Sequence, residues 1–202
     1  MKAKIAIVGS GNIGWALKQL LKSDYDLRQG DIADGFDAKD IKQVKDFLKG
    51  ADAVISAAPF AVNKNIATVA AEEGIGYFDL TEDVETTDFI KTLKSKSILM
   101  PQCGLAPGAI NVCAASMMEE FDSVNEVLMR VGALPRFTTN EMSYYLSWST
   151  NGLINEYCNE ADAIYEGKAI KTMPLEGAEK IVIEGESFEA FNTSGGCATM
   201  CE

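Results

Sequence analysis

The sequence contains no histidine, and its five cysteines follow no framework spacing. Structural zinc sites are built from cysteine and histidine in paired spacings, so the single Cys197-x-x-x-Cys201 pair does not predict a metal site. An odd number of cysteines without a regular spacing also argues against a set of structural disulfides. We therefore predict no metal and a reducing compartment, the cytoplasm.

Positive charge is scarce as well. Eighteen Lys and Arg residues stand against 30 Asp and Glu, which gives a formal net charge of −12. Such a surface disfavours nucleic acid and anionic membranes as partners. No apolar run approaches the roughly 18 residues of a membrane-spanning helix, and the first predicted strand begins at Lys4 with no signal-peptide pattern ahead of it. We expect neither nucleic acid nor a membrane as a partner.

The sequence does contain a glycine-rich turn between a predicted strand and a predicted helix. Residues 5–8 form a short apolar run typical of a buried parallel strand, and Gly9, Gly11 and Gly14 follow in the pattern G-x-G-x-x-G. An acidic residue, Asp31, lies about 20 residues further on. This order of strand, glycines, helix and acid is the fingerprint of a dinucleotide site, in which the helix N-terminus faces the phosphates.

We predict that this loop binds the pyrophosphate of a nicotinamide dinucleotide. A carboxylate at Asp31 can accept hydrogen bonds from both ribose hydroxyls but would repel a 2′-phosphate, so we expect NAD rather than NADP. Two alternatives stay open: the loop could be a glycine-rich turn without a ligand, and Asp31 could only open the turn toward Ile32, leaving Asp34 or Asp37 to face the ribose. The expected cofactor residues are Gly9, Ser10, Gly11, Asn12, Ile13, Gly14, Asp31, Ala57, Ala58 and Pro59.

Short apolar runs alternate with helical stretches over the first half of the chain, which is typical of a parallel α/β sheet. We predict strands over residues 4–8, 25–29, 51–58, 75–80 and 97–100, a short further strand within 32–36, and helices over 15–22, 38–48, 63–73 and 87–93.

The apolar period changes near residue 122. Residues 124–133 and 180–191 alternate as half-exposed antiparallel strands do, with a helix expected over 150–157 and a turn at 166–167. The predicted fold class is α/β: an N-terminal Rossmann domain with a doubly wound parallel sheet over residues 1–121, and part of an α+β substrate and dimerisation domain over residues 122–202.

The chain resembles the saccharopine dehydrogenase superfamily, including lysine 6-dehydrogenases. Four segments carry the resemblance, of which the second and fourth are the more specific: GSGNIG at 9–14, CGLAPGAIN at 103–111, SWSTNGLINE at 147–156 and FEAFNTSGG at 188–196. The resemblance implies a Rossmann domain, a substrate and dimerisation domain, and C-terminal helices that return to the Rossmann part. Because this returning part is absent, we expect a C-terminally truncated chain, and a homodimer formed through the second domain.

The resemblance also implies oxidation of an amine carbon with NAD or NADP, here on the CH–NH or CH–NH2 group of lysine or a lysine-derived amino acid. Of the three arginines, only Arg136 lies outside a predicted strand and is free to bind a carboxylate, which favours a small substrate such as lysine over saccharopine. The expected substrate-binding residues are Cys103, Gly104, Asn111, Arg136, Thr193 and Ser194.

Asp79, at the end of the predicted strand 75–80, is the candidate catalytic residue. Its carboxylate could take a proton from a substrate ammonium or act as its counter-ion; equally, it could cap the turn at residues 81–83. Tyr144, Tyr145 and Trp148 could line a substrate pocket or belong to the core. Two other functions stay open: a nucleotide-binding module or fragment without turnover, and a reductase of carboxylated polyamine precursors, of the carboxynorspermidine type, from the same superfamily.

Overall fold

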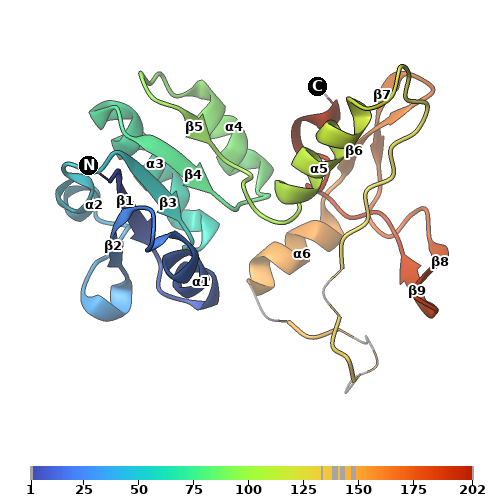
Figure 1. Cartoon of the computed structure of the whole chain (residues 1–202), viewed down its shortest axis with the longest axis horizontal. Helices are drawn as coiled ribbons and strands as arrows, with labels where there is room; N and C mark the ends of the chain where they lie inside the picture. Colours follow the sequence, from blue (N-terminus) through green and yellow to red (C-terminus); the bar gives the residue numbers. More distant parts are fainter. Residues whose placement is uncertain (1, 133, 138–140, 142–143, 147–148, 202) are drawn as a thin grey trace. The chain divides into compact units, whose positions relative to one another are not determined.

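The computed structural model describes residues 2–132, 134–137, 141, 144–146 and 149–201. Its backbone divides into two compact units, Met1–Gly104 and Leu105–Glu202. The first contains a parallel sheet with covering helices, and the second contains helices and two antiparallel hairpins (Figure 1). The predicted α/β fold class is therefore confirmed.

The sheet of the first unit has five parallel strands in the order β2-β1-β3-β4-β5. The interior strand β1 has four consecutive buried residues, as expected for a strand that is covered on both faces. The strands are β1 (Lys4–Val8), β2 (Asp26–Gly30), β3 (Ala53–Ser56), β4 (Gly76–Asp79) and β5 (Leu99–Met100).

The strand order reverses at β1, because the chain first moves from β1 to β2 and then crosses back to β3. Right-handed crossovers therefore place the first helix on one face of the sheet and the next three on the other. These helices are α1 (Asn12–Leu21), α2 (Ile41–Leu48), α3 (Asn63–Glu73) and α4 (Val84–Thr92). Ligands of open α/β sheets bind beyond the carboxyl ends of the strands at such a reversal.

The main hydrophobic core lies between the sheet and helices α2, α3 and α4. Alternate side chains of the strands face these helices, so apolar side chains of the strands pack against apolar side chains of the helices in one layer. The largest contributors are Val8, Val54 and Tyr77 from the strands and Val44, Leu48, Ile66, Val69 and Ile90 from the helices.

The segment after β2 differs from its prediction. Residues 32–36 were expected to hold a short strand, but Ile32–Asp34 form a 3-10 helix, η1. The cause is local: the side chain of Asp31 accepts a hydrogen bond from the N–H of Ala33, and Gly35 closes the turn with φ of 86°. This capping interaction competes with the extended conformation that a strand requires.

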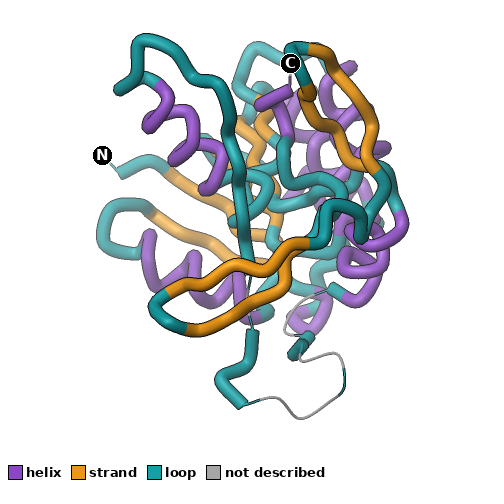
Figure 2. The backbone as a smooth tube through the Cα atoms, turned by 90° about the vertical axis from the view of Figure 1, so that its right-hand side faces the viewer, coloured by secondary structure: helices purple, strands orange, loops and turns teal. Residues whose placement is uncertain are grey.

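The described residues of the second unit form two helices and two hairpins, each hairpin closed by a Glu-Gly pair at positive φ. Both turn residues at positive φ are typical of the type I′ turn, whose twist suits a two-residue hairpin. The hairpins are visible as paired strands in Figure 2. The elements are α5 (Ala109–Met118), α6 (Thr150–Cys158), β6 (Ala161–Tyr165), β7 (Lys168–Thr172), β8 (Glu179–Ile183), β9 (Glu186–Ala190) and the 3-10 helix η3 (Ala198–Cys201).

The predicted strand over residues 124–133 is wrong for its described part, since residues 124–132 form no strand. Alternation alone predicts which side chains share a face, but a strand also needs a neighbour to supply backbone hydrogen bonds. Arg130 instead holds this segment to β8 through its side chain, which pairs with Glu179 at 2.6 and 3.0 Å.

The compact units also divide earlier than the predicted domains, which met at residues 121 and 122. Helix α5 belongs to the second unit because the side chain of Asn111 donates to the carbonyls of Gly196 and Cys197 at 3.2 and 3.0 Å. No helix in the described part of the chain is long and apolar enough to cross a membrane.

Two leucines provide a test of this core. Leu48 at the end of α2 is fully buried, whereas Leu20 on α1 is 73% exposed. We expect Leu48→Ala to lower the free energy of unfolding by about 2–5 kcal/mol, because it removes buried methyl groups and leaves a cavity. Leu20→Ala should change it by no more than about 0.5 kcal/mol. Urea unfolding followed by circular dichroism measures both, and equal effects would contradict the assigned packing.

Candidate functional site

The glycine loop after β1 is shaped by two close backbone contacts. Gly9 has φ of 102°, and a Cβ there would lie 2.7 Å from the carbonyl oxygen of Ala57. At Gly14 a Cβ would lie only 2.1 Å from the carbonyl oxygen of Gly9, so α1 can begin this close to the sheet only with glycine at that position. The two residues therefore fix the direction of α1.

Gly11 is different, because no other residue needs the space beside it. Its backbone is extended, with φ of −63°, and a Cβ would meet nothing within 4 Å. Gly11 is the N-cap of α1, and no side chain caps that end of the helix. The first turn therefore leaves N–H groups available in front of open space, which is the arrangement that binds a phosphate.

Asp31 connects the end of β2 to this loop. One carboxylate oxygen accepts a hydrogen bond from the N–H of Ser10 at 2.6 Å, and the other accepts from the N–H of Ala33 at 3.0 Å. The bonds from Ala33 and Ser10 lower the pKa of Asp31, so the group is ionised at neutral pH. A carboxylate has about four acceptor positions, so two bonds leave room for a ligand hydroxyl. Asp31 thus opens the turn toward Ile32 and also reaches the glycine loop.

The predicted residues after β3 lie on the other side of the loop. The N–H of Ala57 donates to the carbonyl of Val8 at 2.8 Å, which places residues 57–59 beside the start of the glycine turn. Pro59 then leads into the 3-10 helix η2 (Phe60–Val62). The structure therefore gathers residues 9–14, Asp31 and residues 57–59 at the point where the strand order reverses.

Asp79, the candidate catalytic residue, ends β4 with no exposed surface. One oxygen of its carboxylate accepts hydrogen bonds from the hydroxyl of Tyr77 at 2.6 Å and the amide of Asn63 at 3.2 Å. The other accepts from the N–H groups of Thr81 and Gln102 at 2.9 and 3.2 Å. The contact to Thr81 is the turn-capping interaction that the sequence offered as the alternative to catalysis.

The network around Asp79 extends one residue further. The hydroxyl of Ser56, at the end of β3, donates to the amide oxygen of Asn63 at 2.7 Å. Burial raises the pKa of Asp79, and the hydrogen bonds from Tyr77 and the two N–H groups oppose this rise. Burial beside this carboxylate also raises the pKa of Tyr77. Sequence reasoning placed Ser56 only at a strand end near the cofactor and missed Asn63 and Tyr77 as members of this network; the one signal for Asn63 was an asparagine that opens a helix.

Cys103 lies directly against the same carboxyl end of the sheet. Its N–H donates to the backbone carbonyl of Asp79 at 2.7 Å, and its thiol lies 3.4 Å from the carbonyl oxygen of Met100. Burial and the nearby Asp79 raise the pKa of the Cys103 thiol, which keeps it protonated at neutral pH. The preceding residue, Gln102, has φ of 65°, an uncommon conformation for a residue with a side chain.

The second unit holds the remaining predicted substrate residues, and two of them contact the backbone of neighbouring segments. Asn111 accepts from the N–H of Gly108 at 2.7 Å, in addition to its bonds to residues 196 and 197. Ser194 donates its hydroxyl to the carbonyl of Asn155 at 3.0 Å and its N–H to that of Glu156, so it satisfies the C-terminal end of α6. Thr193 directly precedes it in the same segment.

The other predicted residues of this unit are not gathered with that segment. Arg136 is exposed, and its guanidinium lies over the ring of Phe137 at 5.8 Å. Tyr145 is 65% exposed, so the core position, one of its two predicted alternatives, is wrong. Tyr144 is half-buried, and Trp148 lies outside the described residues.

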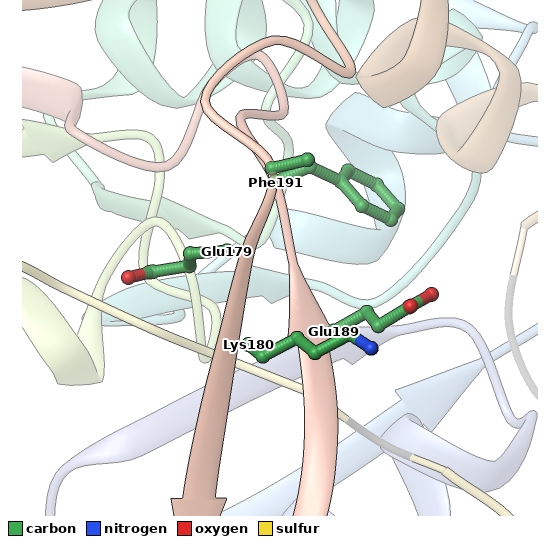
Figure 3. A pocket seen from close by; sticks show the side chains of 5 residues that line it. Glu179, Lys180, Glu189 and Phe191 are labelled. Atoms are coloured by element: carbon green, nitrogen blue, oxygen red, sulfur yellow. The ribbon is translucent and has the colours of Figure 1, made fainter.

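A hollow of about 230 Å³ lies on the β8–β9 hairpin, and none of the predicted site residues lines it. Lys180 and Glu189 are cross-strand neighbours in it, with Phe191 at one end (Figure 3). Ala178 and Glu179 complete its lining. Within the part of the chain that the structure describes, no group of three or more metal-binding side chains could hold a metal ion.

Comparison with known proteins bears on both units. Residues 104–200 match the family model of the saccharopine dehydrogenase C-terminal domain. Apo saccharopine dehydrogenase (L-Glu forming) from Saccharomyces cerevisiae is similar in structure, with a TM-score of 0.67 and 19% sequence identity over 95% of this chain. The match covers 50% of that structure, so the chain spans about half its length.

Two other solved structures resemble the chain only in part. The protein lin1944 from Listeria innocua matches 59% of this chain, and 72% of its own, at 18% identity with a TM-score of 0.33. A small-chain dehydrogenase in complex with NADPH matches 59% of this chain, and 65% of its own, at 15% identity with a TM-score of 0.34. At these TM-scores neither likeness establishes a shared overall fold.

Two glycines of the loop should respond differently to substitution. We expect Gly11→Val to change the free energy of unfolding by no more than about 1 kcal/mol, because the added side chain enters open space at an N-cap. The same side chain should weaken NADH binding at least about ten-fold, since it occupies the space in front of α1. Gly14→Ala should lower the free energy of unfolding by about 1–3 kcal/mol or more through its clash with Gly9.

Urea unfolding and titration of NADH fluorescence measure the two properties separately. A Gly11→Val protein that binds NADH as tightly as the parent would contradict the assignment of the loop, and an unperturbed Gly14→Ala protein would contradict the close approach of α1.

Proposed function

We propose that this chain is a nicotinamide-dependent oxidoreductase of amino acids from the saccharopine dehydrogenase superfamily, because residues 104–200 match the C-terminal domain model of that family and the fold resembles a saccharopine dehydrogenase. The proposed reaction is the NAD-dependent oxidation of the CH–NH or CH–NH2 group of lysine or a lysine-derived amino acid. The observation that carries the cofactor assignment is the glycine loop: an uncapped helix N-terminus in front of open space, beside a carboxylate at the end of β2.

The residues of the loop fit a dinucleotide. The N–H groups at the start of α1 would hold the pyrophosphate, and the free acceptor positions of Asp31 would bind the adenine ribose. Residues 57–59 border the opposite side of the loop, where the nicotinamide half is expected. When bound, the cofactor supplies the chemistry by accepting a hydride from the amine carbon, and the protein contributes binding and orientation.

For the substrate site, we propose the residues that the sequence identified. Arg136 is exposed and can pair with a substrate carboxylate. Cys103 and Gly104 follow the carboxyl end of β5, while Thr193 adjoins the segment that Asn111 holds. The bonds of Asn111 and Ser194 to backbone groups support a role in shaping that segment, alongside any direct contact with substrate.

We further propose that the protein acts in the cytoplasm as a homodimer assembled through its second unit. Apolar side chains remain exposed on both hairpins of that unit, among them Ile164 and Ile183 at 54% and Val182 at 70%. Exposed apolar side chains on short two-stranded sheets favour burial against further protein.

A second candidate function is nucleotide binding without turnover. The chain spans about half the length of the saccharopine dehydrogenase that it resembles, and the glycine loop by itself provides for binding but not for chemistry. The two candidates predict the same cofactor affinity and differ only in catalysis.

Spectroscopy distinguishes these candidates. We expect the protein to reduce NAD in the presence of lysine, with an increase in absorbance from NADH, and Gly11→Val to abolish the increase because it blocks the cofactor. Saccharopine and carboxynorspermidine, tested in the same assay, would reveal a different substrate. NADH binding without turnover on any of the three would favour the binding module, and failure to bind NAD or NADH would contradict both candidates.

Asp31 should determine the preference for NAD. We expect the parent to bind NAD more tightly than NADP, and Asp31→Ala to reduce this preference by roughly ten-fold, since charge-assisted hydrogen bonds to the ribose are lost. Asp34→Ala is the matched control, because Asp34 is the alternative acid in the same turn. Calorimetric titration with each cofactor measures the ratio; tighter NADP binding in the parent, or an effect in Asp34→Ala instead, would assign the selection to another residue.

A further inference from the structure

The carboxylate of Asp79 is a buried charge that neutral groups surround. Its four hydrogen-bond donors are the hydroxyl of Tyr77, the amide of Asn63 and two backbone N–H groups, none of which carries a positive charge. The three N–H donors can only donate, which favours the ionised carboxylate. Hydrogen bonds therefore stabilise the anion, but they do not neutralise its field.

The position of this anion relates it to the cofactor site. Val8, Ser56 and Asp79 are paired in register across β1, β3 and β4, so the three residues form one row at the carboxyl edge of the sheet. Val8 immediately precedes the glycine turn, and Asp79 is two strands away. At about 4.8 Å between neighbouring strands, the two backbones lie roughly 10 Å apart.

The two halves of a dinucleotide lie on opposite sides of the strand reversal. Asp31 at the end of β2 identifies the side of the adenosine half, so the nicotinamide half extends over the ends of β3 and β4. Ser56 and Asp79 occupy those ends. The nicotinamide ring carries a positive charge when oxidised and none when reduced. A fixed anion on this side therefore attracts the oxidised ring and not the reduced one.

We propose that Asp79 is a positioning residue whose buried negative charge stabilises the oxidised, cationic nicotinamide relative to the reduced form. The proposal rests on the cofactor assignment made above. Asp79 does not need to touch the ring, because a Coulomb interaction acts at this distance through a medium of low polarity. The same carboxylate holds Gln102 and Thr81, so it also fixes the loops that follow β4 and β5.

The size of the effect depends on the separation of the two charges, for which we take the two strand spacings between Val8 and Asp79. Two unit charges roughly 10 Å apart change a binding constant between about two-fold and fifteen-fold, as the effective dielectric constant falls from about 80 to about 20. We therefore expect Asp79→Asn to weaken NAD⁺ binding relative to NADH binding by a factor in this range. The ratio of the two dissociation constants is the decisive quantity, because a distorted pocket weakens both forms together.

Two variants serve as controls. Tyr77→Phe removes one donor from the same network but keeps the charge, so it should leave the ratio unchanged even if both affinities fall. Asp40→Asn removes one negative charge from the exposed N-cap of α2 and retains a capping side chain, so it controls for the overall charge of the protein. NADH is followed by its fluorescence and NAD⁺ by calorimetry, with circular dichroism to verify the fold.

A pH titration of the parent protein tests the same idea if Asp79→Asn does not fold. Protonation of Asp79 should remove the preference, so the ratio should shift toward NADH as the pH falls through the raised pKa of this carboxyl group. Tyr77 and Cys103, the titratable neighbours, have raised pKa values and stay protonated throughout the acid range. The chain has no histidine, so no imidazole obscures the transition.

The outcomes separate this proposal from the cofactor assignment. A parent protein that binds neither NAD⁺ nor NADH contradicts the assignment itself. A folded Asp79→Asn protein with the parental ratio contradicts only the charge effect, as does a parental ratio that is constant on acidification. An equal change in Asp40→Asn would attribute the effect to the overall charge of the protein.

Discussion

The close contact between α1 and the turn after β1 determines the arrangement of the candidate site. With glycine at position 14, the helix begins against the carbonyl of Gly9, and its first N–H groups point beyond the carboxyl edge of the sheet. A larger residue would displace the helix as a whole, because the obstructing atom belongs to the backbone rather than to a side chain that can rotate. Asp31 and residues 57–59 can contribute to one site only because this helix end is fixed beside them.

The same edge of the sheet also holds the buried polar network. A carboxylate without exposed surface is costly to bury, and here its acceptor positions are all occupied by donors from β4, α3 and the loops that follow β4 and β5. Loss of any one donor leaves an acceptor unsatisfied, at a typical cost of about 1–3 kcal/mol. Loops that would otherwise be free to move are thereby held in one conformation next to the cofactor site.

The sequence predicts the elements of the first unit well wherever local signals agree. The strand Lys4–Val8 and the helix Asn63–Glu73 have the predicted bounds, the second because Gly74 ends the helix in a left-handed conformation. The prediction for residues 32–36 failed where a side-chain cap outweighed an extended conformation, and that for residues 124–133 failed where no partner strand is available. Both failures depend on partners that periodicity does not identify.

The candidate site was predictable to a similar degree. A motif that combines a strand, three glycines and an acid identifies the loop, because each residue has a local geometric task. The hydrogen bonds of Asp79 to Asn63 and Gln102 were beyond prediction, since these residues come from separate segments that only the folded sheet brings together. The same packing buries Asp79 completely. We therefore propose a positioning role for its carboxylate in place of the catalytic role expected from the sequence.

The bonds from Asn111 to residues 196 and 197 have a consequence for the order in which the chain folds during synthesis. The first compact unit comprises residues 1–104, so that unit can fold once those residues have left the ribosome. In the second unit, α5 cannot form these hydrogen bonds until a segment more than eighty residues later has been synthesised. During that interval Asn111 lacks the backbone carbonyls to which its amide donates in the folded unit, so this helix cannot yet be fixed in its final position.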